Sequence, residues 1–196
     1  AEEYVVYSFG EVVMLTEDCA EAILLADLPN IVGTVLNEDG KIVIELLEKY
    51  CCKKVVDSEY QSRTGFGIDR IVFTYLDYIL CRDNPSEFKD FQFQFRTSIE
   101  HFFPQHPING ENVVDEKNRD SFGNLALITV SANSKFSNML PIHKVEQYKD
   151  VIEQSPKLMR MKKLLDANNR VWDDNMVAKH NAEMLALLKA ETEARV

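Results

Sequence analysis

The sequence lacks the features that mark a membrane protein or a secreted one. No apolar run approaches the roughly 18 residues that a membrane helix needs, and no basic segment precedes an apolar core at the N-terminus. The cysteines show neither metal-type spacing nor a disulfide pattern; they are Cys19, Cys51, Cys52 and Cys81. These absences predict a cytoplasmic protein with reduced thiols and no membrane contact. Because the chain begins with Ala1 and not with Met, we expect it to be a piece of a longer protein.

A surplus of basic residues is also missing. The net charge is −10, which argues against a general nucleic-acid binder, since phosphate contacts need Lys and Arg. The charge is unevenly distributed: residues 1–95 hold 18 acidic and 8 basic residues, whereas residues 96–196 hold 14 of each. Within residues 131–170 there are 8 basic and 4 acidic residues. This local surplus permits phosphate contacts there but does not by itself indicate them.

What is present is the composition of a globular protein, with 45% apolar and 28% charged residues in 196 positions. Helical patterns predict helices over 16–28, 41–54, 68–82, 141–153, 157–166 and 172–194. Strands are predicted at 91–103 and 124–130, with a long polar loop over 104–121. Ser155 and Pro156 are predicted to be the cap and the first residue of their helix.

The sequence from 96 to 144 carries the candidate chemistry. An adjacent acid and imidazole, Glu100 and His101, end an apolar run and are followed by Pro104. Hydrolysis of a phosphodiester needs an activated water and a cation that stabilises the charge on the phosphate. An imidazole titrates near neutral pH, so His101 is predicted to be the general base. Glu100 offers the hard carboxylate oxygen that Mg²⁺ prefers.

Further polar residues follow at the next two junctions between elements. Asn124 opens the second predicted strand, where its backbone or amide oxygen is expected to hold the tautomer of the imidazole. Asn133 opens the following helix and offers an amide oxygen as a second metal ligand. Arg96, Lys135 and Lys144 are candidates for contacts with DNA phosphates.

The segments EHFFP, FGNLALIT and ANSKFSN together resemble the motif of HNH, or His-Me finger, nucleases. They are more closely similar to the C-terminal nuclease domain of GmrSD-type, modification-dependent restriction endonucleases. The likeness covers residues 96–144 and extends more faintly through 68–82 and the helix after Trp172. It implies an α+β fold with a mainly helical part at 1–90 and a nuclease domain with a ββα-metal finger at 91–196.

The resemblance also implies roles for single residues. His101 would be the base and Asn124 its orienting partner, while Glu100 and Asn133 would bind a single divalent ion, Mg²⁺ or Mn²⁺. Asn138 would support the helix and join the DNA-binding residues. The substrate would be double-stranded DNA, with or without modified bases, in a bacterial restriction or defence system. In this family a nucleotide-hydrolysing domain precedes the nuclease domain, and we do not expect that domain in this chain.

The sequence departs from the HNH pattern in two places. The usual arginine of the last helix is replaced by Lys179 or His180, which concerns the contacts with DNA. The cysteine pairs that hold a structural zinc in some HNH proteins are missing, which does not concern catalysis. Three functions therefore stay open: a metal-dependent endonuclease, a catalytically degenerate finger that binds nucleic acid or protein, and a helical scaffold with a coincidental motif.

Other conspicuous residues have simpler interpretations. His106 precedes a proline and is interpreted as a loop residue, whereas His143 and His180 are predicted to be solvated helix residues. Trp172 is predicted to anchor the last helix in the core.

Overall fold

The structure is a computed structural model that describes residues 5–6, 12–13, 44–57, 67–94, 97–108 and 113–195. Helices predominate and the strands form small antiparallel pairs, so the predicted α+β class is confirmed. In chain order the elements are β1 (Val5–Val6), β2 (Val12–Val13), α3 (Ile44–Asp57), α4 (Arg70–Asp83), β3 (Thr97–His101), α5 (Glu116–Arg119), the 3-10 turn η3 (Phe122–Asn124), β4 (Leu125–Thr129), α6 (Val130–Phe136), α7 (Pro141–Gln147), α8 (Lys149–Glu153), α9 (Pro156–Ala167) and α10 (Asp174–Arg195).

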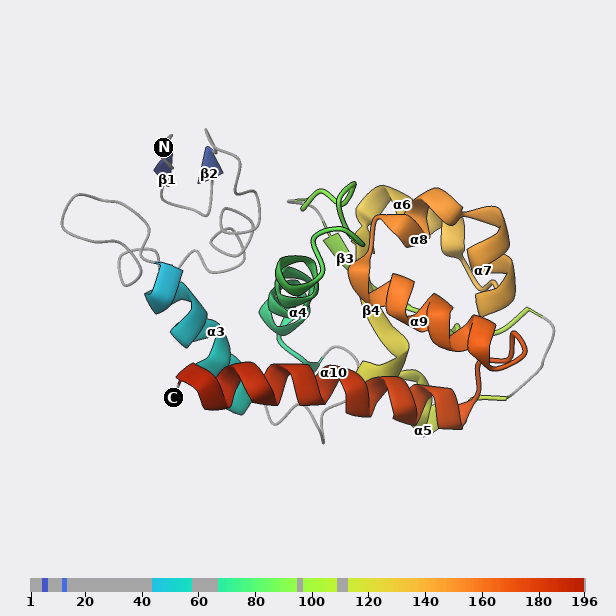
Figure 1. The fold of residues 1–196 in the computed structure, drawn as a ribbon. Helices are drawn as coiled ribbons and strands as arrows, with labels where there is room; N and C mark the ends of the chain where they lie inside the picture. Colours follow the sequence, from blue (N-terminus) through green and yellow to red (C-terminus); the bar gives the residue numbers. More distant parts are fainter. Residues whose placement is uncertain are drawn as a thin grey trace.

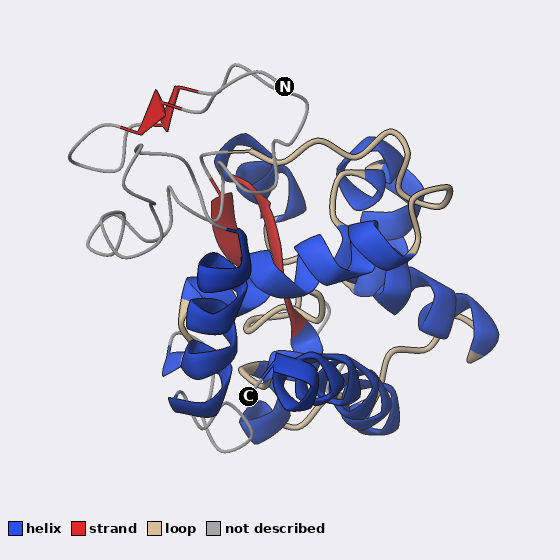
Figure 2. Cartoon of the chain, turned by 60° about the vertical axis from the view of Figure 1, so that its left-hand side comes forward, coloured by secondary structure: helices blue, strands red, loops and turns tan. Residues whose placement is uncertain are grey.

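The central element is the antiparallel hairpin of β3 and β4, which helices flank (Figure 2). Its residue pairs run from Thr97 with Thr129 to His101 with Leu125. β4 passes directly into α6, because Thr129 caps that helix: its hydroxyl accepts a hydrogen bond from the backbone N–H of Ala132 at 3.2 Å. The segment from β3 to α6 thus consists of two antiparallel strands followed by a helix.

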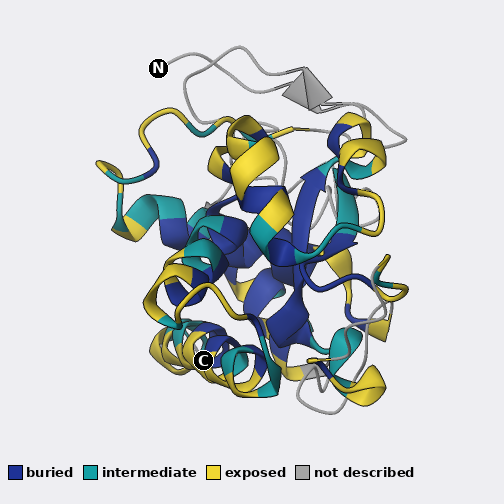
Figure 3. Cartoon of the chain, turned by 90° about the vertical axis from the view of Figure 1, so that its right-hand side faces the viewer, coloured by how far each residue is buried: buried dark blue, intermediate teal, exposed yellow. Residues whose placement is uncertain are grey.

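β4 lies between two hydrophobic cores. Side chains alternate along a strand, so Leu125 and Leu127 project to one side and Ala126 and Ile128 to the other. The first pair packs in a core with α3, α4 and α10, and the second packs in a core with α6 to α9. Figure 3 shows the buried residues gathered around the hairpin and the outer faces of the helices exposed. The unbroken apolar run of β4 is explained by burial on both faces.

α10 runs along one side of the molecule and connects its parts (Figure 1). It packs against α3, α4, α9 and η3. The approach is closest at Gly123, where an added Cβ would lie 2.2 Å from the carbonyl oxygen of Val177 and 2.8 Å from Cβ of Asn181. Glycine is required there because any side chain would collide with the backbone of α10. Among the described residues, no helix combines the length and apolarity that crossing a membrane would need.

Most predicted helices in the described ranges are confirmed, with ends that shift by a few residues. The single helix predicted over 141–153 is wrong, because α7 and α8 are separated at Tyr148, whose ψ of 54° interrupts the helical path. The ring of Tyr148 packs against that of Phe136, with centroids 6.0 Å apart. Packing of this partly buried aromatic side chain accompanies the break. The helix predicted over 16–28 lies outside the described residues, as does the start of the helix predicted over 41–54.

The strand predicted over 91–103 is confirmed only for Thr97–His101. The segment 91–94 is irregular, and the rings of Phe91 and Phe93 pack edge-on with centroids 4.7 Å apart. Their alternation in the sequence therefore reflects aromatic packing and not a strand ladder. The predicted loop over 104–121 contains the short helix α5, and its residues 109–112 lie outside the described residues.

His180 is fully buried, so the prediction of a solvated residue is wrong. Its ring lies 6.2 Å from that of Trp172, which is buried as predicted. Burial, together with the nearby charges of Lys157 and Arg160, lowers the pKa of His180 well below its usual value. His180 is therefore a neutral core residue.

The N-terminus of α9 is capped from another helix. Ser155 and Pro156 occupy the predicted cap and first helical positions, but the hydroxyl of Ser155 does not cap the helix, because it donates to the carbonyl oxygen of Leu127 at 2.7 Å. The buried carboxylate of Asp77 in α4 instead accepts a hydrogen bond from the backbone N–H of Lys157. A negative charge is favourable at this end of a helix. Burial nevertheless raises the pKa of Asp77 to about 7, and the charge of Lys157 offsets only part of that rise.

This raised pKa predicts a pH-dependent stability. Between 3.8 and about 7 the folded chain binds a proton at Asp77 that the unfolded chain releases, so stability falls as pH rises through this window. We expect Asp77→Asn to remove the dependence, because the amide still accepts from Lys157 but does not ionise. Relative to the wild type, its free energy of unfolding should rise by up to about 4 kcal/mol between pH 4 and pH 8.

Urea denaturation followed by circular dichroism at both pH values measures this difference. Asp90→Asn is the matched control, because it removes the same charge from an exposed side chain. A pH trend in Asp77→Asn equal to that of the wild type would contradict the role given to Asp77.

Candidate active site

The site is built around the point where β3 ends. Asn124, the last residue of η3, is fully buried, and its backbone carbonyl accepts from the N–H of Phe102 at 2.8 Å. Its side-chain oxygen accepts from the N–H of Phe103 at 2.9 Å and from Nε1 of Trp172 at 3.0 Å. Its side-chain nitrogen donates to the carbonyl oxygens of Phe103 at 2.9 Å and Arg119 at 2.7 Å. An amide has two donor hydrogens and two acceptor positions, so this side chain is fully used.

Asn124 therefore positions the chain on both sides of the site and does not bind the imidazole through its side chain. It fixes the two residues that follow His101, and it fixes Arg119, the residue before Asp120. The side-chain contact with the imidazole that was expected from Asn124 is made by another residue.

That residue is Asp120, which was not predicted from the sequence. Its Oδ1 lies 2.6 Å from Nε2 of His101 and also accepts from Nε2 of Gln105 at 3.0 Å. The side chain of His101 is 11% exposed and that of Asp120 is 39% exposed, so the contact lies at the edge of the solvent. A carboxylate at Nε2 orients the ring and favours the tautomer with hydrogen on that nitrogen.

The loop that carries Asp120 is anchored by the start of α10. Oδ1 of Asp174 accepts from the backbone N–H of Asp115 at 3.0 Å and from Nδ2 of Asn118 at 2.6 Å. No regular pattern in the sequence marks Asp120. Its position four residues before Asn124, in an otherwise polar loop, was the only available signal.

Glu100 forms a buried ion pair with Lys144. Nζ of Lys144 lies 2.9 Å from Oε1 of Glu100 and also donates to the backbone carbonyl of His101. Lys144 is fully buried, and its ammonium lies 5.1 Å from the ring centroid of Phe136. Burial lowers the pKa of Lys144, and the charge of Glu100 acts against that decrease. The prediction that Lys144 contacts a DNA phosphate is wrong, because its side chain is fully buried and does not reach the surface.

The other predicted residues differ in how close they come to this point. Asn133 in α6 donates through Nδ2 to Oγ of Ser98 at 3.0 Å, which places its amide against β3. Glu100 is two residues from Ser98 and projects to the same face of the strand. Lys135 and Asn138 are exposed, with Lys135 3.9 Å from Asp150. Arg96 lies outside the described residues.

The donor set can be compared with the needs of a metal ion. Within the described ranges, no three His, Cys, Asp or Glu side chains gather into a metal-binding cluster. Mg²⁺ keeps several waters and needs only one or two carboxylates, so one acid and one amide oxygen fit its chemistry. Lys144 occupies Oε1 of Glu100, which leaves Oε2 for such an ion.

Two further contacts hold η3 and β4 in place. Nζ of the fully buried Lys157 donates to the carbonyl oxygens of Phe122 and Leu125, each at 2.6 Å. Its ammonium also lies 4.4 Å from the ring centroid of Phe122. The turn that contains Asn124 is therefore fixed from α9 as well as from Trp172.

The comparison with known families gives this geometry a context. The family described as GmrSD restriction endonucleases, C-terminal domain, matches residues 56–187, about two thirds of the chain. The chain belongs to this family. The matched region contains the hairpin, η3 and helices α4 to α9, so the residues at the end of β3 lie inside this restriction endonuclease domain. No curated protein and no solved structure matches the chain.

The hydrogen bonds of Asn124 predict a large loss of stability on truncation. Asn124→Ala leaves two backbone carbonyls, one backbone N–H and the indole N–H of Trp172 without their partner. An unsatisfied buried group costs about 1–3 kcal/mol, so we expect a loss of at least about 3 kcal/mol. Trp172→Phe removes one of the four bonds and keeps an aromatic ring, and its loss should be clearly smaller.

Urea denaturation followed by circular dichroism measures both variants, since Trp172 is the only tryptophan and its fluorescence is lost in one of them. If Asn124→Ala cost less than Trp172→Phe, the central role of Asn124 would be disproved.

Proposed function

We propose that the chain is a metal-dependent DNA endonuclease domain of the HNH type, which hydrolyses phosphodiester bonds as part of a restriction system. The observation that carries the proposal is the pair of His101 and Asp120 at the end of β3, beside Glu100, in a member of a restriction endonuclease family. β3, β4 and α6 would be the two strands and the helix of a ββα-metal finger. Residues 91–196 would be the nuclease domain and 1–90 a helical region in front of it.

His101 would act as the general base. With Nε2–H donated to Asp120, the lone pair of the ring lies on Nδ1, which can take a proton from a water molecule. Asp120 and Gln105 would hold the ring in this tautomer and orientation while the proton moves.

Glu100, through Oε2, and Asn133, through its amide oxygen, would hold a single divalent ion, Mg²⁺ or Mn²⁺. When bound, this ion would neutralise charge on the phosphate. Lys144 would keep the Glu100 carboxylate oriented, because it holds Oε1 and the backbone of the next residue together. Removing one partner of a buried ion pair leaves the other charge uncompensated, so the two residues act as a unit.

The DNA would approach over the exposed side of α6. Lys135 is exposed in α6 and Asn138 in the turn after it, and with Arg96 they would contact the phosphates of double-stranded DNA. Lys144 is not included, because it is fully buried. Recognition of modified bases and nucleotide hydrolysis would belong to another part of a longer, cytoplasmic protein.

Cleavage of supercoiled plasmid by the full-length protein tests the base. With Mg²⁺ or Mn²⁺ present we expect nicking or linearisation, lost on chelation with EDTA. His101→Ala should lower the rate by at least about 100-fold, the usual contribution of a general base. His143→Ala is the matched control, because His143 is an exposed histidine in α7, and it should leave the rate unchanged. Undiminished cleavage by His101→Ala would remove His101 from the mechanism.

Asp120 is tested separately as a positioning residue. Asp120→Asn should lower kcat by about 10- to 100-fold, because the amide no longer selects one tautomer of His101. KM for DNA should stay the same. Glu116→Gln makes the same change at an exposed position in the neighbouring helix α5 and should have no effect. A rise in KM at constant kcat would instead assign Asp120 to DNA binding.

A second function is favoured by one observation. The carboxylate proposed as metal ligand is already paired with an internal ammonium, which suits a finger that binds DNA without cutting it. Salt-sensitive DNA binding with no cleavage in any divalent metal would select this function.

A further inference from the structure

A partly open pocket lies at the end of the hairpin opposite to His101. Thr97 and Thr129, the first residue pair of the hairpin, line it, whereas His101 belongs to the last pair. These pairs are four positions apart, which corresponds to about 13 Å along the strand. The pocket is therefore distinct from the candidate active site. Its volume is about 20 Å³.

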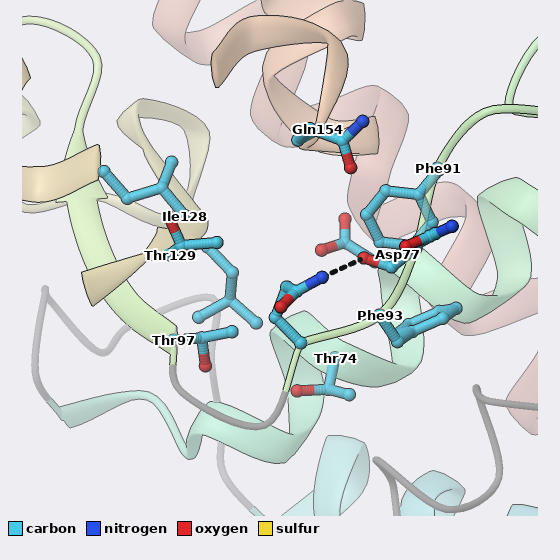
Figure 4. A pocket seen from close by; sticks show the side chains of 11 residues that line it. Thr74, Asp77, Phe91, Phe93, Thr97, Ile128, Thr129 and Gln154 are labelled. Carbon is cyan, nitrogen blue, oxygen red and sulfur yellow. Dashed lines mark hydrogen bonds between the residues drawn. The ribbon is translucent and has the colours of Figure 1, made fainter. Parts of the chain in front are cut away.

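A buried carboxylate points into this pocket. Figure 4 shows Asp77 among the lining side chains, between Phe91 and Ile128. Asp77 is 5% exposed, and one side of its carboxylate caps α9 through the N–H of Lys157. The other oxygen, Oδ1, is buried and has no hydrogen-bond partner among the described residues. A buried oxygen without a hydrogen-bond partner is destabilising unless a guest supplies a donor.

The lining around Asp77 suits a guest that donates hydrogen bonds and carries positive charge. Thr74, Thr97, Thr129 and Gln154 add side-chain oxygens, and the described lining residues include no Lys, Arg or His. The edge-on pair of Phe91 and Phe93 adds aromatic rings, whose faces attract a cation. Asp77 is the only charged side chain among the described lining residues.

The size of the pocket restricts the part of the guest that enters. A volume of about 20 Å³ holds one group of the size of a water molecule, and a nucleobase is far larger. An ammonium group has this size and carries three donor hydrogens. The rest of such a guest would lie in the open mouth of the pocket.

The charges near Asp77 do not already satisfy it. The ammonium of Lys157 is directed to the carbonyl oxygens of Phe122 and Leu125, and it acts on Asp77 only at longer range. Cys81, in the same helix as Asp77, interacts with it too, but burial raises the pKa of the thiol and keeps it uncharged.

We propose that this pocket binds the terminal ammonium group of a small linear amine, a diamine or polyamine, with Asp77 as its counter-ion. The ammonium donates one hydrogen bond to Oδ1 of Asp77 and others to the surrounding threonine and glutamine oxygens. The alkyl chain leaves the pocket past Phe91 and Phe93. This binding does not depend on the proposed nuclease activity.

Isothermal titration of the full chain with putrescine at pH 8 tests the proposal. We expect saturable binding with one site. Asp77→Asn should weaken it at least tenfold, and Asp90→Asn, which removes an exposed carboxylate next to the lining segment, should leave it unchanged. Tetramethylammonium has the same charge as one ammonium but no N–H and a larger size, and it should not bind.

A second measurement uses the wild type alone, so it does not depend on the folding of a variant. Since the pKa of Asp77 is about 7, its ionised fraction is about tenfold lower at pH 6 than at pH 8, and putrescine should bind about tenfold more weakly at pH 6. Absence of saturable binding, equal binding by Asp77→Asn, equal binding of tetramethylammonium or equal affinity at both pH values overturns the proposal. Tighter binding of Nα-acetyl-lysine methylamide than of putrescine overturns the proposal that the ligand is a small amine and indicates a lysine side chain of a protein instead.

Discussion

The side chain of Asn124 is the interaction on which the candidate site depends. One buried amide makes four hydrogen bonds that join Phe103 just after β3, Arg119 at the end of α5 and Trp172 before α10. A buried amide that loses some of its partners costs more than it stabilises, so the arrangement forms as a whole. In the sequence, His101 directly precedes Phe102 and Phe103, and Asp120 directly follows Arg119; Asn124 binds the backbone of all three of these neighbours. Asn124 therefore supports the contact of His101 with Asp120 at 2.6 Å, although its own side chain binds neither of them.

Two buried lysines complete this framework, one on each side of β4. Lys144 holds Glu100 and the carbonyl of His101 on the side of α6 to α9. Lys157 donates to the carbonyl oxygens of Phe122, which begins η3, and Leu125, which begins β4. It lies on the side of α4, where Asp77 interacts with it. Burying an ammonium group costs desolvation free energy. Each lysine offsets this cost with a nearby carboxylate and with backbone carbonyl oxygens that are not used in the hydrogen bonds between β3 and β4. Both belong to the basic segment 131–170, so part of its charge serves the interior and not phosphate.

Local patterns predicted much of the fold, and they were wrong where packing decided. The apolar periodicity of α4 and the proline that opens α9 are local signals, and both helices were predicted nearly to their ends. The alternation of Phe91 and Phe93 imitates a strand, yet these rings pack against each other in an irregular segment. The break at Tyr148 likewise accompanies the packing of its partly buried ring against Phe136. Period alone does not distinguish a strand from a row of aromatic contacts.

For the site, the sequence by itself determined the order of the residue types: an acid and a histidine that end one strand, an asparagine before the next, and an asparagine in the helix that follows. These positions follow from local backbone geometry. Only the tertiary structure decided that Asp120 meets His101, that Lys144 points inward to Glu100, and that Asp77 caps α9. Each of these contacts joins residues that are 19 to 80 positions apart in the sequence. Periodicity shows which face of an element is buried, but which distant faces meet depends on how the whole chain packs.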